Sequence, residues 1–133
     1  MPIAQVAMNY RAAAVKTATP GQLVLMLFDG ALRNVATALA GFAIESVGVR
    51  IEQINNHLLK AQAIVRELQG SLDLKAGGEF ATTMWALYDF MLDRLRVANL
   101  QKDPEPIRIV ERLLTEVRGA WATMLTQNPV EAA

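Results

Sequence analysis

The sequence predicts an all-α protein, an antiparallel up-down-up-down four-helix bundle with a short N-terminal helical segment. Three observations support this fold class. Four long segments carry apolar side chains at steps of three and four residues, the spacing of one helix face. Short connections that contain glycine or proline separate these segments. No segment shows the strict apolar-polar alternation of a half-buried strand.

The chain begins with an alanine-rich segment, residues 3–14. Ile3, Val6 and Tyr10 fall on one face if this segment is helical. A helix shorter than about 15 residues is marginal alone, so this face needs something to pack on. We expect residues 1–16 to form a cap segment that docks on the bundle and detaches from it. A frayed terminus is the alternative.

The first long helix is expected from Pro20 to about Ala43. Thr19 is a suitable N-cap, Pro20 occupies the first helical position, and Gln22 completes a capping box. The apolar positions of this helix cover about half of its circumference, a wider arc than a coiled-coil seam. They are Val24, Leu25, Leu27, Phe28, Ala31, Leu32, Val35, Leu39 and Phe42.

The opposite face of this helix carries its only charged residues. Asp29 and Arg33 are four residues apart, which is the spacing of neighbours on a helix surface. Met26 lies among them, and we expect its side chain to be exposed.

Two further helices are expected, one from about Val49 to Leu68 or a little beyond, and one from near Glu79 to near Asn99. The first has one apolar seam, made of Ile51, Ile54, Leu58, Ala61, Val65, Leu68 and Leu72. The second has a core stripe, made of Phe80, Met84, Leu87, Met91, Leu95 and Ala98. A second stripe stands beside it, made of Ala81, Trp85, Tyr88 and Leu92. Asn99 suits a helix C-terminus.

Asp103 and Pro104 start the fourth helix by the same N-cap and first-position rules. Its seam comprises Ile107, Val110, Leu114, Val117, Trp121 and Met124, flanked by Ile109, Leu113 and Ala120. Asn128 and Pro129 end it. We expect one domain over residues 1–133, with the bundle at 19–126 and a tail at 127–133.

The composition excludes several classes of protein. Lys+Arg number 13 and Asp+Glu number 13, so the chain has no general electrostatic attraction for nucleic acid or anionic lipid. The absence of cysteine removes disulfides and thiol chemistry. No apolar stretch approaches the ~20 residues that span a bilayer, and no secretory signal begins the chain. We expect a cytoplasmic protein without membrane insertion.

The sequence shows no catalytic motif, and we expect neither an enzyme nor a bound cofactor. It lacks a phosphate-binding glycine loop and a nucleophile elbow. A single histidine without cysteine cannot build an ordinary zinc site or the Glu-x-x-His pairs of di-iron bundles, so no metal is expected. Asp89 and Asp93 share a helix face, but Arg94 and Arg96 nearby indicate a solvated charged face.

One alternative function remains open. His57 and Lys60 form a His-x-x-Lys pattern that resembles histidine phosphotransfer domains, which are helical bundles of similar length. In those domains an exposed imidazole carries a phosphoryl group, and the lysine supports it. Leu59 and Gln62 are not typical of that family. A partly exposed histidine without such a role is therefore the simpler interpretation.

The chain carries more large apolar residues than four helix seams require. A soluble monomer rarely exposes a large apolar patch without a use for it. The surplus either completes a wider core or a homodimer, or forms a surface that docks amphipathic segments of a partner. As a set, these residues favour the docking surface. The candidate docking residues are Leu25, Met26, Leu59, Trp85, Tyr88, Leu92, Ile109 and Leu113.

Ordered motifs along nearly the whole chain carry a family resemblance. They are Thr17-Ala18-Thr19-Pro20, Gln22-Leu23, Met26-Leu27-Phe28-Asp29-Gly30-Ala31, Lys60-Ala61-Gln62 with Ile64 and Glu67-Leu68, Gly77-Gly78-Glu79 with Leu87-Tyr88-Asp89, and Ala98-Asn99 with Trp121. Together they resemble FliS, the family of bacterial flagellar secretion chaperones. In the opening helix, the residues of the motif are Thr19, Pro20, Gln22, Asp29 and Gly30.

The resemblance implies a cytoplasmic chaperone that binds the C-terminal segment of flagellin, which is disordered in the monomer and drives filament assembly. Covering this segment prevents premature polymerisation and keeps the subunit ready for delivery to the flagellar export gate. The resemblance also implies a role for Ile3, Val6 and Tyr10, in covering the apolar surface and in meeting the export gate.

Three positions depart from the pattern of the family. Trp85 stands where a small or polar residue is usual, and Phe28 and Phe90 stand where tyrosine is common. These departures leave the implied function in place and concern the fine shape of the peptide groove. For the oligomeric state, we expect a monomer or a weak homodimer.

The capping box leads to a first prediction. Thr19→Ala should lower the free energy of unfolding by about 1 kcal/mol, because an N–H group of the first helical turn loses its acceptor. Thr19→Ser keeps the hydroxyl and should change this free energy little. Thermal melts of both variants measure the difference. Equal losses would show that Thr19 acts through its methyl group.

Overall fold

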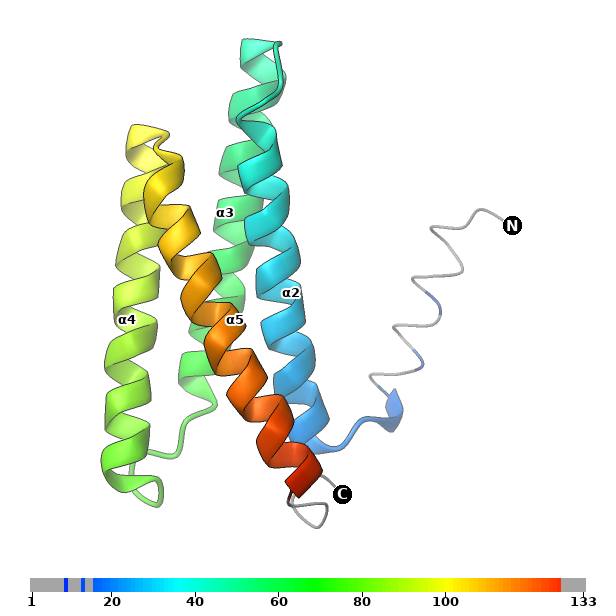
Figure 1. Cartoon of the computed structure of the whole chain (residues 1–133), viewed down its shortest axis with the longest axis vertical. Coiled ribbons are helices and arrows are strands. Elements are labelled where there is room, and N and C mark those ends of the chain that lie inside the picture. The colour runs from blue at the N-terminus through cyan, green and yellow to red at the C-terminus, as the bar shows by residue number, and fades with distance from the viewer. Residues whose placement is uncertain (1–8, 10–12, 14–15, 128–133) are drawn as a thin grey trace.

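The computed structural model describes Asn9, Ala13 and residues 16–127. Within this part of the chain, four long helices of alternating direction form a bundle (Figure 1). They are α2 (Pro20–Gly41), α3 (Val47–Gly70), α4 (Gly78–Gln101) and α5 (Pro104–Gln127). Each of α2 and α4 packs against both α3 and α5, so the four helices form a ring. This arrangement confirms the predicted bundle, and the described residues contain no strand.

Some of the expected features fall outside the part of the chain that the structure describes. Ile3, Val6 and Tyr10 are among them, so the expected N-terminal cap stays a prediction. The expected tail also lies there, apart from Gln127, which is the last residue of α5.

The start of α2 has the capping box that the sequence predicts. The side-chain oxygen of Thr19 accepts a hydrogen bond from the backbone N–H of Gln22 at 3.2 Å. In return, the side-chain oxygen of Gln22 accepts one from the backbone N–H of Thr19 at 3.0 Å. Because these bonds satisfy N–H groups that have no partner within the helix, they determine where α2 begins.

The core lies between the four helices and takes a stripe of side chains from each. Its buried apolar residues are Phe28, Ala31, Val35, Ala38, Ile54, Leu58, Ala61, Val65, Leu68, Tyr88, Met91, Leu95, Ala98, Ile107, Val110 and Leu114. All except Ala38 belong to the stripes predicted from the sequence. The stripe residues toward the helix ends, such as Val24, Leu39 and Trp121, are only partly buried.

One residue of the predicted α3 seam and one of the predicted α4 core stripe are exposed, which corrects the sequence analysis. Ile51 is 45% exposed and Phe80 is 65% exposed. Ile51 lies in the second turn of α3, and this end of α3 extends beyond the ends of α4 and α5 (Figure 1). Phe80 lies in the first turn of α4, at the edge of the groove described below. Helical spacing identifies a face but not how far a neighbouring helix covers it.

Three polar or surface positions also differ from the expectation. Asp29 and Arg33 are not the only charges on this face of the bundle, because the Asp29 carboxylate accepts a hydrogen bond from Arg118 of α5. Met26 is half-buried rather than exposed. The third helix ends near Asn99 as expected, at Gln101, but the left-handed C-cap residue is Lys102, with a φ of 49°, rather than Asn99.

The connection between α3 and α4 is compact and needs glycine at two positions. The Asp73 carbonyl accepts a hydrogen bond from the N–H of Gly77 at 2.7 Å. A Cβ atom on Gly77 would lie 2.5 Å from the Cβ of Ala81 and 2.7 Å from the Asp73 carbonyl oxygen. Gly78 has a φ of 55°, which side-chain-bearing residues rarely adopt. These two glycines set the position at which α4 begins.

By length and composition alone, α2 is apolar enough to cross a membrane, with a mean hydropathy of 1.5. The sequence analysis did not anticipate such a stretch. Core helices of bundles pass the same test, so this finding is weak evidence for a membrane span. The apolar residues of α2 include Phe28, Ala31 and Val35, which lie in the core between the helices. Packing within the bundle accounts for this composition.

The glycine contact leads to a second prediction. Gly77→Ala should lower the free energy of unfolding by about 1–3 kcal/mol, because the new methyl group overlaps the Asp73 carbonyl and Ala81. Gly119→Ala in α5 is the matched control. Nothing lies within 4 Å of its Cβ position, so it should raise this free energy by roughly 0.5–1 kcal/mol. Urea denaturation measures both. Unchanged stability of Gly77→Ala would show that the connection shifts without loss.

Candidate functional site

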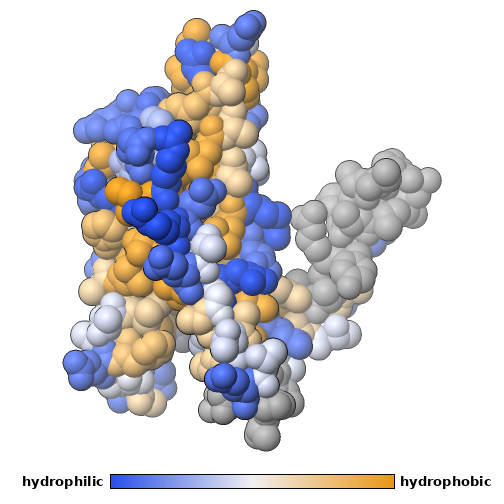
Figure 2. Space-filling model, in the orientation of Figure 1, coloured by the Kyte–Doolittle hydropathy of each residue, from blue (hydrophilic) through white to orange (hydrophobic). Residues whose placement is uncertain are grey.

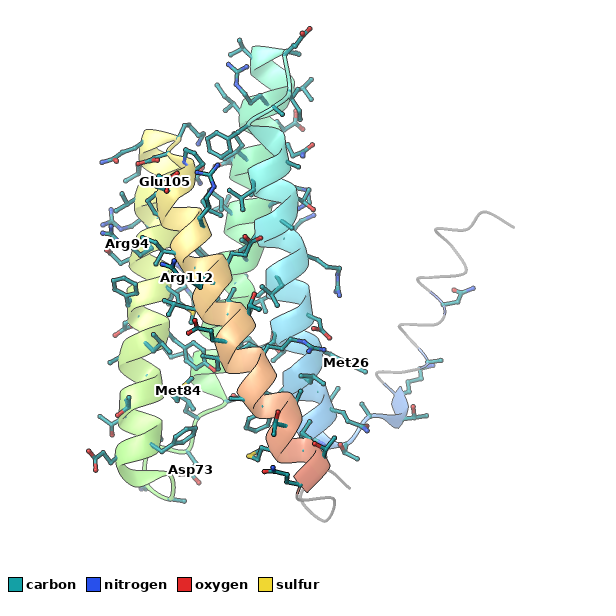
Figure 3. The ribbon with its side chains drawn as sticks, viewed as in Figure 1. Met26, Asp73, Met84, Arg94, Glu105 and Arg112 are labelled. Atoms are coloured by element: carbon teal, nitrogen blue, oxygen red, sulfur yellow. The ribbon has the colours of Figure 1, made fainter. Side chains whose placement is uncertain are left out.

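An apolar groove of about 550 Å³ lies between the N-terminal half of α4 and the C-terminal half of α5. Residues of α2 form its floor, and the α3–α4 connection lies at one end. In Figure 2 apolar surface borders the groove, and Figure 3 labels Met84 and Asp73 beside it. We call it the α4/α5 groove. Its lining residues are Val24, Phe28, Ser71, Leu72, Asp73, Gly77, Phe80, Ala81, Met84, Tyr88, Glu116, Val117, Ala120, Trp121 and Met124.

Two hydrogen bonds hold α5 against α2 beside this groove. The Trp121 indole N–H donates to the Gly21 carbonyl oxygen at 2.9 Å. The Arg118 Nε donates to the Asp29 Oδ1 at 2.6 Å, as a charge-assisted bond. Figure 1 shows α5 crossing the bundle from the C-terminal end of α4 to the N-terminal end of α2. The C-terminal half of α5 therefore diverges from α4, and the groove opens between them.

Tyr88 is a polar group in this apolar lining. Tyr88 lines the groove, and the residue is only 3% exposed. None of the hydrogen bonds among the described residues involves its hydroxyl. Burial raises the pKa of Tyr88 from 10.0 to about 12. The hydroxyl is therefore protonated at neutral pH and has a hydrogen to donate.

The charged residues of the groove lining are both acidic. Asp73 is held in place because its Oδ1 accepts hydrogen bonds from the backbone N–H groups of Lys75 and Ala76, at 3.1 and 3.0 Å. Glu116 is an exposed residue of α5 and takes part in none of the ion pairs between described residues. Because no described cation lines the groove, its electrostatic potential favours a basic ligand.

Three of the eight docking residues predicted from sequence lie on this side of the bundle. Tyr88 lines the groove itself. Ile109 and Leu113 lie on the stripe of α5 that also carries the groove residues Glu116 and Ala120. They therefore continue the α5 wall beyond the groove. Both are half-buried.

The other five predicted residues lie elsewhere. Leu59 on α3 and Trp85 on α4 are 52% and 38% exposed, which confirms that they lie outside the core. Leu92 of α4 and Leu25 of α2 are half-buried. Met26 is also half-buried, on the side of α2 away from α4 in Figure 3. The structure does not bring these five residues into the groove, and their part in binding stays a prediction.

The sequence analysis assigned most groove residues to the core. Met84, Val117, Trp121 and Met124 are in predicted seams, and the seams are correct, but the groove leaves their ends partly open. One signal was available in the sequence. Methionine is common on adaptable docking surfaces because its side chain is flexible and polarisable, and two of these four residues are methionines.

The contact between α3 and α4 on the other side of the bundle is closed by polar bonds. The buried Gln69 amide donates to the Trp85 carbonyl at 3.1 Å and to the Asp89 carboxylate at 2.8 Å. Asp93 lies among arginines, and its hydrogen bonds with Arg94 and Arg96 lower its pKa. Asp89 and Asp93 therefore have separate partners, as expected for a charged surface rather than a catalytic pair.

His57 links two helices. Its Nδ1 lies 2.9 Å from the Asn34 Oδ1, and the Asn34 amide donates to the Gly30 carbonyl at 2.9 Å. The half-buried imidazole thus joins α3 to α2. This bond gives His57 a structural role without phosphotransfer. Among the described residues, no group of His, Cys, Asp and Glu side chains could hold a metal ion.

Comparison with known proteins places the chain among chaperones. The family model described as "Flagellar protein FliS" matches residues 3–128. The flagellar secretion chaperone FliS of Bacillus subtilis is 40% identical over 112 residues, which cover 84% of this chain and 80% of the relative. The FliS chaperone of Salmonella typhimurium is 42% identical over 109 residues, with 81% and 78% covered. That of Escherichia coli is 34% identical over 125 residues, with 88% of each chain covered.

These matches favour the chaperone interpretation over phosphotransfer, because the family and the three relatives are chaperones rather than enzymes or phosphocarriers. The family model covers nearly the whole chain, and two relatives reach at least 40% identity. The chain therefore belongs to the FliS family of flagellar secretion chaperones.

Proposed function

We propose that this protein is a cytoplasmic export chaperone for flagellin. It binds the disordered C-terminal segment of flagellin, prevents premature polymerisation and assists delivery of the subunit to the flagellar type III export apparatus. The observation that carries this proposal is the α4/α5 groove, an open apolar site of about 550 Å³ on a member of a secretion chaperone family. The names of the relatives support a role in flagellar secretion.

The groove suits an amphipathic helix. It runs between two helices, so a third helix can insert its apolar side chains at the usual three- and four-residue steps. The groove volume falls within the roughly 300–1,000 Å³ of typical ligand sites. Several large apolar side chains fill such a space. The remainder of a longer segment then lies on the bundle surface.

The surface beyond the groove offers further contacts for the same segment. Ile109 and Leu113 extend the α5 wall, while Leu59 of α3 and Trp85 of α4 are exposed outside the groove lining. A disordered segment that folds on binding can follow such a distributed surface. The entropy lost on ordering lowers the affinity per unit area, which suits a chaperone that must release its cargo. This function requires no catalytic group.

A third prediction tests the groove with two aromatic residues of α4. Phe80 lines the groove and Phe90 does not, and they are 65% and 46% exposed. Phe80→Asp should weaken binding of the flagellin C-terminal segment on the order of tenfold, because it removes an apolar wall and adds a charge. Phe90→Asp should have a much smaller effect. Calorimetric titration gives the affinities, and circular dichroism checks the fold.

The cargo itself supplies the second control for this experiment. Flagellin that lacks its C-terminal segment should not bind the wild-type chaperone. Equal weakening by Phe80→Asp and Phe90→Asp would mean that the segment binds outside the α4/α5 groove. Equal binding of complete and truncated flagellin would contradict the proposed function.

The N-terminal segment leads to a fourth prediction. We propose that residues 1–14 cover part of the flagellin site in the free protein and are released on binding. This segment leads into the first turn of α2, where the Gly21 carbonyl binds the groove residue Trp121. Deleting residues 1–14 should therefore leave flagellin binding intact or tighter, and should increase self-association because apolar surface is uncovered. Titration and light scattering measure both effects.

Delivery to the export gate should be impaired by the same deletion, and a secretion assay in cells measures it. The full-length protein with Ile3, Val6 and Tyr10 changed to serine is the matched control, since it keeps the chain length but loses the apolar face. A large loss of flagellin affinity on deletion would show that the segment grips the cargo instead of covering its site.

A further inference from the structure

We infer that Tyr88 determines specificity in the α4/α5 groove, its hydroxyl donating a hydrogen bond to an acceptor on the bound helix, while Asp73 and Glu116 select a basic side chain on the same helix. This inference rests on the proposed function, because it assumes that the groove takes a helical segment. The ligand it specifies is an amphipathic helix with one hydrogen-bond acceptor in its apolar stripe and basic residues beside that stripe.

The first step concerns the hydroxyl of Tyr88. The hydroxyl of a largely buried tyrosine usually binds the protein or water. The groove's other aromatic donor follows this rule, because the Trp121 indole binds the Gly21 carbonyl at 2.9 Å. Tyr88 is 3% exposed and has no such partner among the described residues. Its oxygen is not one of the fully buried side-chain atoms of this part of the chain that lack a partner, so water can reach it while the groove is empty. Since Tyr88 lines the groove, an occupant of the groove can supply the missing acceptor.

The second step concerns what happens when the groove is filled. An entirely hydrocarbon helix removes water from the Tyr88 hydroxyl and offers nothing in return, which leaves a buried donor unsatisfied. A helix with a glutamine, asparagine or serine at the facing position satisfies this donor. Sites built around a polar group discriminate more strongly than purely apolar ones. Tyr88 therefore allows an otherwise apolar groove to reject unrelated apolar helices.

The third step concerns charge. The charged residues of the lining are Asp73 and Glu116, and both are acidic. The Asp73 carboxylate is fixed by backbone N–H groups through Oδ1 alone, so its second oxygen remains available to a ligand. Neither carboxylate is part of the ion pairs between described residues. A basic side chain at the groove edge is attracted, and an acidic one is repelled.

The test uses synthetic amphipathic helical peptides that share one apolar stripe of leucines. In one series, a single glutamine replaces leucine at each stripe position in turn. Binding to the wild-type protein and to Tyr88→Phe is measured by calorimetry, and the flagellin C-terminal peptide is measured in parallel. For each position, the dissociation constant of the glutamine peptide is divided by that of the all-leucine peptide. At one position, this ratio should be about threefold to tenfold lower for the wild-type protein than for Tyr88→Phe.

Charge is tested with the same peptides flanked by either lysine or glutamate. Asp73→Asn keeps the Oδ1 acceptor of the connection but removes the charge, and Glu116→Gln does the same on α5. Each variant should weaken the lysine-flanked peptides about twofold to fivefold and should strengthen or leave unchanged the glutamate-flanked ones. Equal effects on both peptide series would overturn the electrostatic part of the inference.

Stability separates a binding role of Tyr88 from a structural one. Because its hydroxyl has no partner among the described residues, Tyr88→Phe should melt at or above the wild-type temperature. A large loss of stability would show that the hydroxyl is satisfied within the protein, and would overturn the inference. So would identical peptide ratios for the two proteins at every position, or no peptide binding at all.

The two proposals fail separately in this design. Failure of the flagellin peptide to bind, with a clear coupling between Tyr88 and glutamine in the synthetic series, would support the inference and contradict the proposed cargo. Flagellin binding that is equal for wild-type protein and Tyr88→Phe, together with no coupling in the synthetic series, would support the cargo and overturn the inference.

Discussion

The attachment of α5 to α2 is the interaction on which the candidate site depends. The Trp121 indole binds the carbonyl of Gly21, and Arg118 binds Asp29. A helical carbonyl can accept this second bond because its oxygen has two lone pairs. As both bonds lie on the C-terminal half of α5, that half cannot also close on the start of α4. Side chains that would be core in a tighter bundle therefore become groove walls.

The two sides of α4 differ in whether their polar side chains have hydrogen-bond partners. Toward α3, the Gln69 amide binds both the Trp85 carbonyl and the Asp89 carboxylate, which fixes the two helices against one another. Toward α5, Tyr88 lines the apolar groove, and its hydroxyl binds none of the described residues. Buried polar networks are rigid when complete. The α3 side of α4 is thus a structural contact, while on its α5 side the Tyr88 hydroxyl can still bind a ligand in the groove.

The connection between α3 and α4 sets the end of the groove. The close approach of Gly77 to the Asp73 carbonyl and Ala81, and the positive φ of Gly78, allow a short turn directly into α4. This turn places Phe80 at the groove edge and holds the Asp73 carboxylate in its lining. The glycine pair of the family motif therefore has a physical reason: a methyl group at either position disturbs the same edge of the site.

The sequence alone determined the four helices, their order and most of the core, because helix caps and apolar spacing are local properties that do not depend on neighbours. The capping box of Thr19 and Gln22 predicted where α2 begins, and the stripes around Leu58 and Leu114 are buried as predicted. The ordered motifs also indicated the family. Tertiary structure decided which stripe residues stay covered. Phe80 is exposed and Met84 lines a groove because α5 leans toward α2, through contacts between residues about 90 to 100 positions apart in the chain. No local pattern specifies how two helices diverge. Only the packing of the helices therefore creates the groove and leaves the Tyr88 hydroxyl without a partner among the described residues.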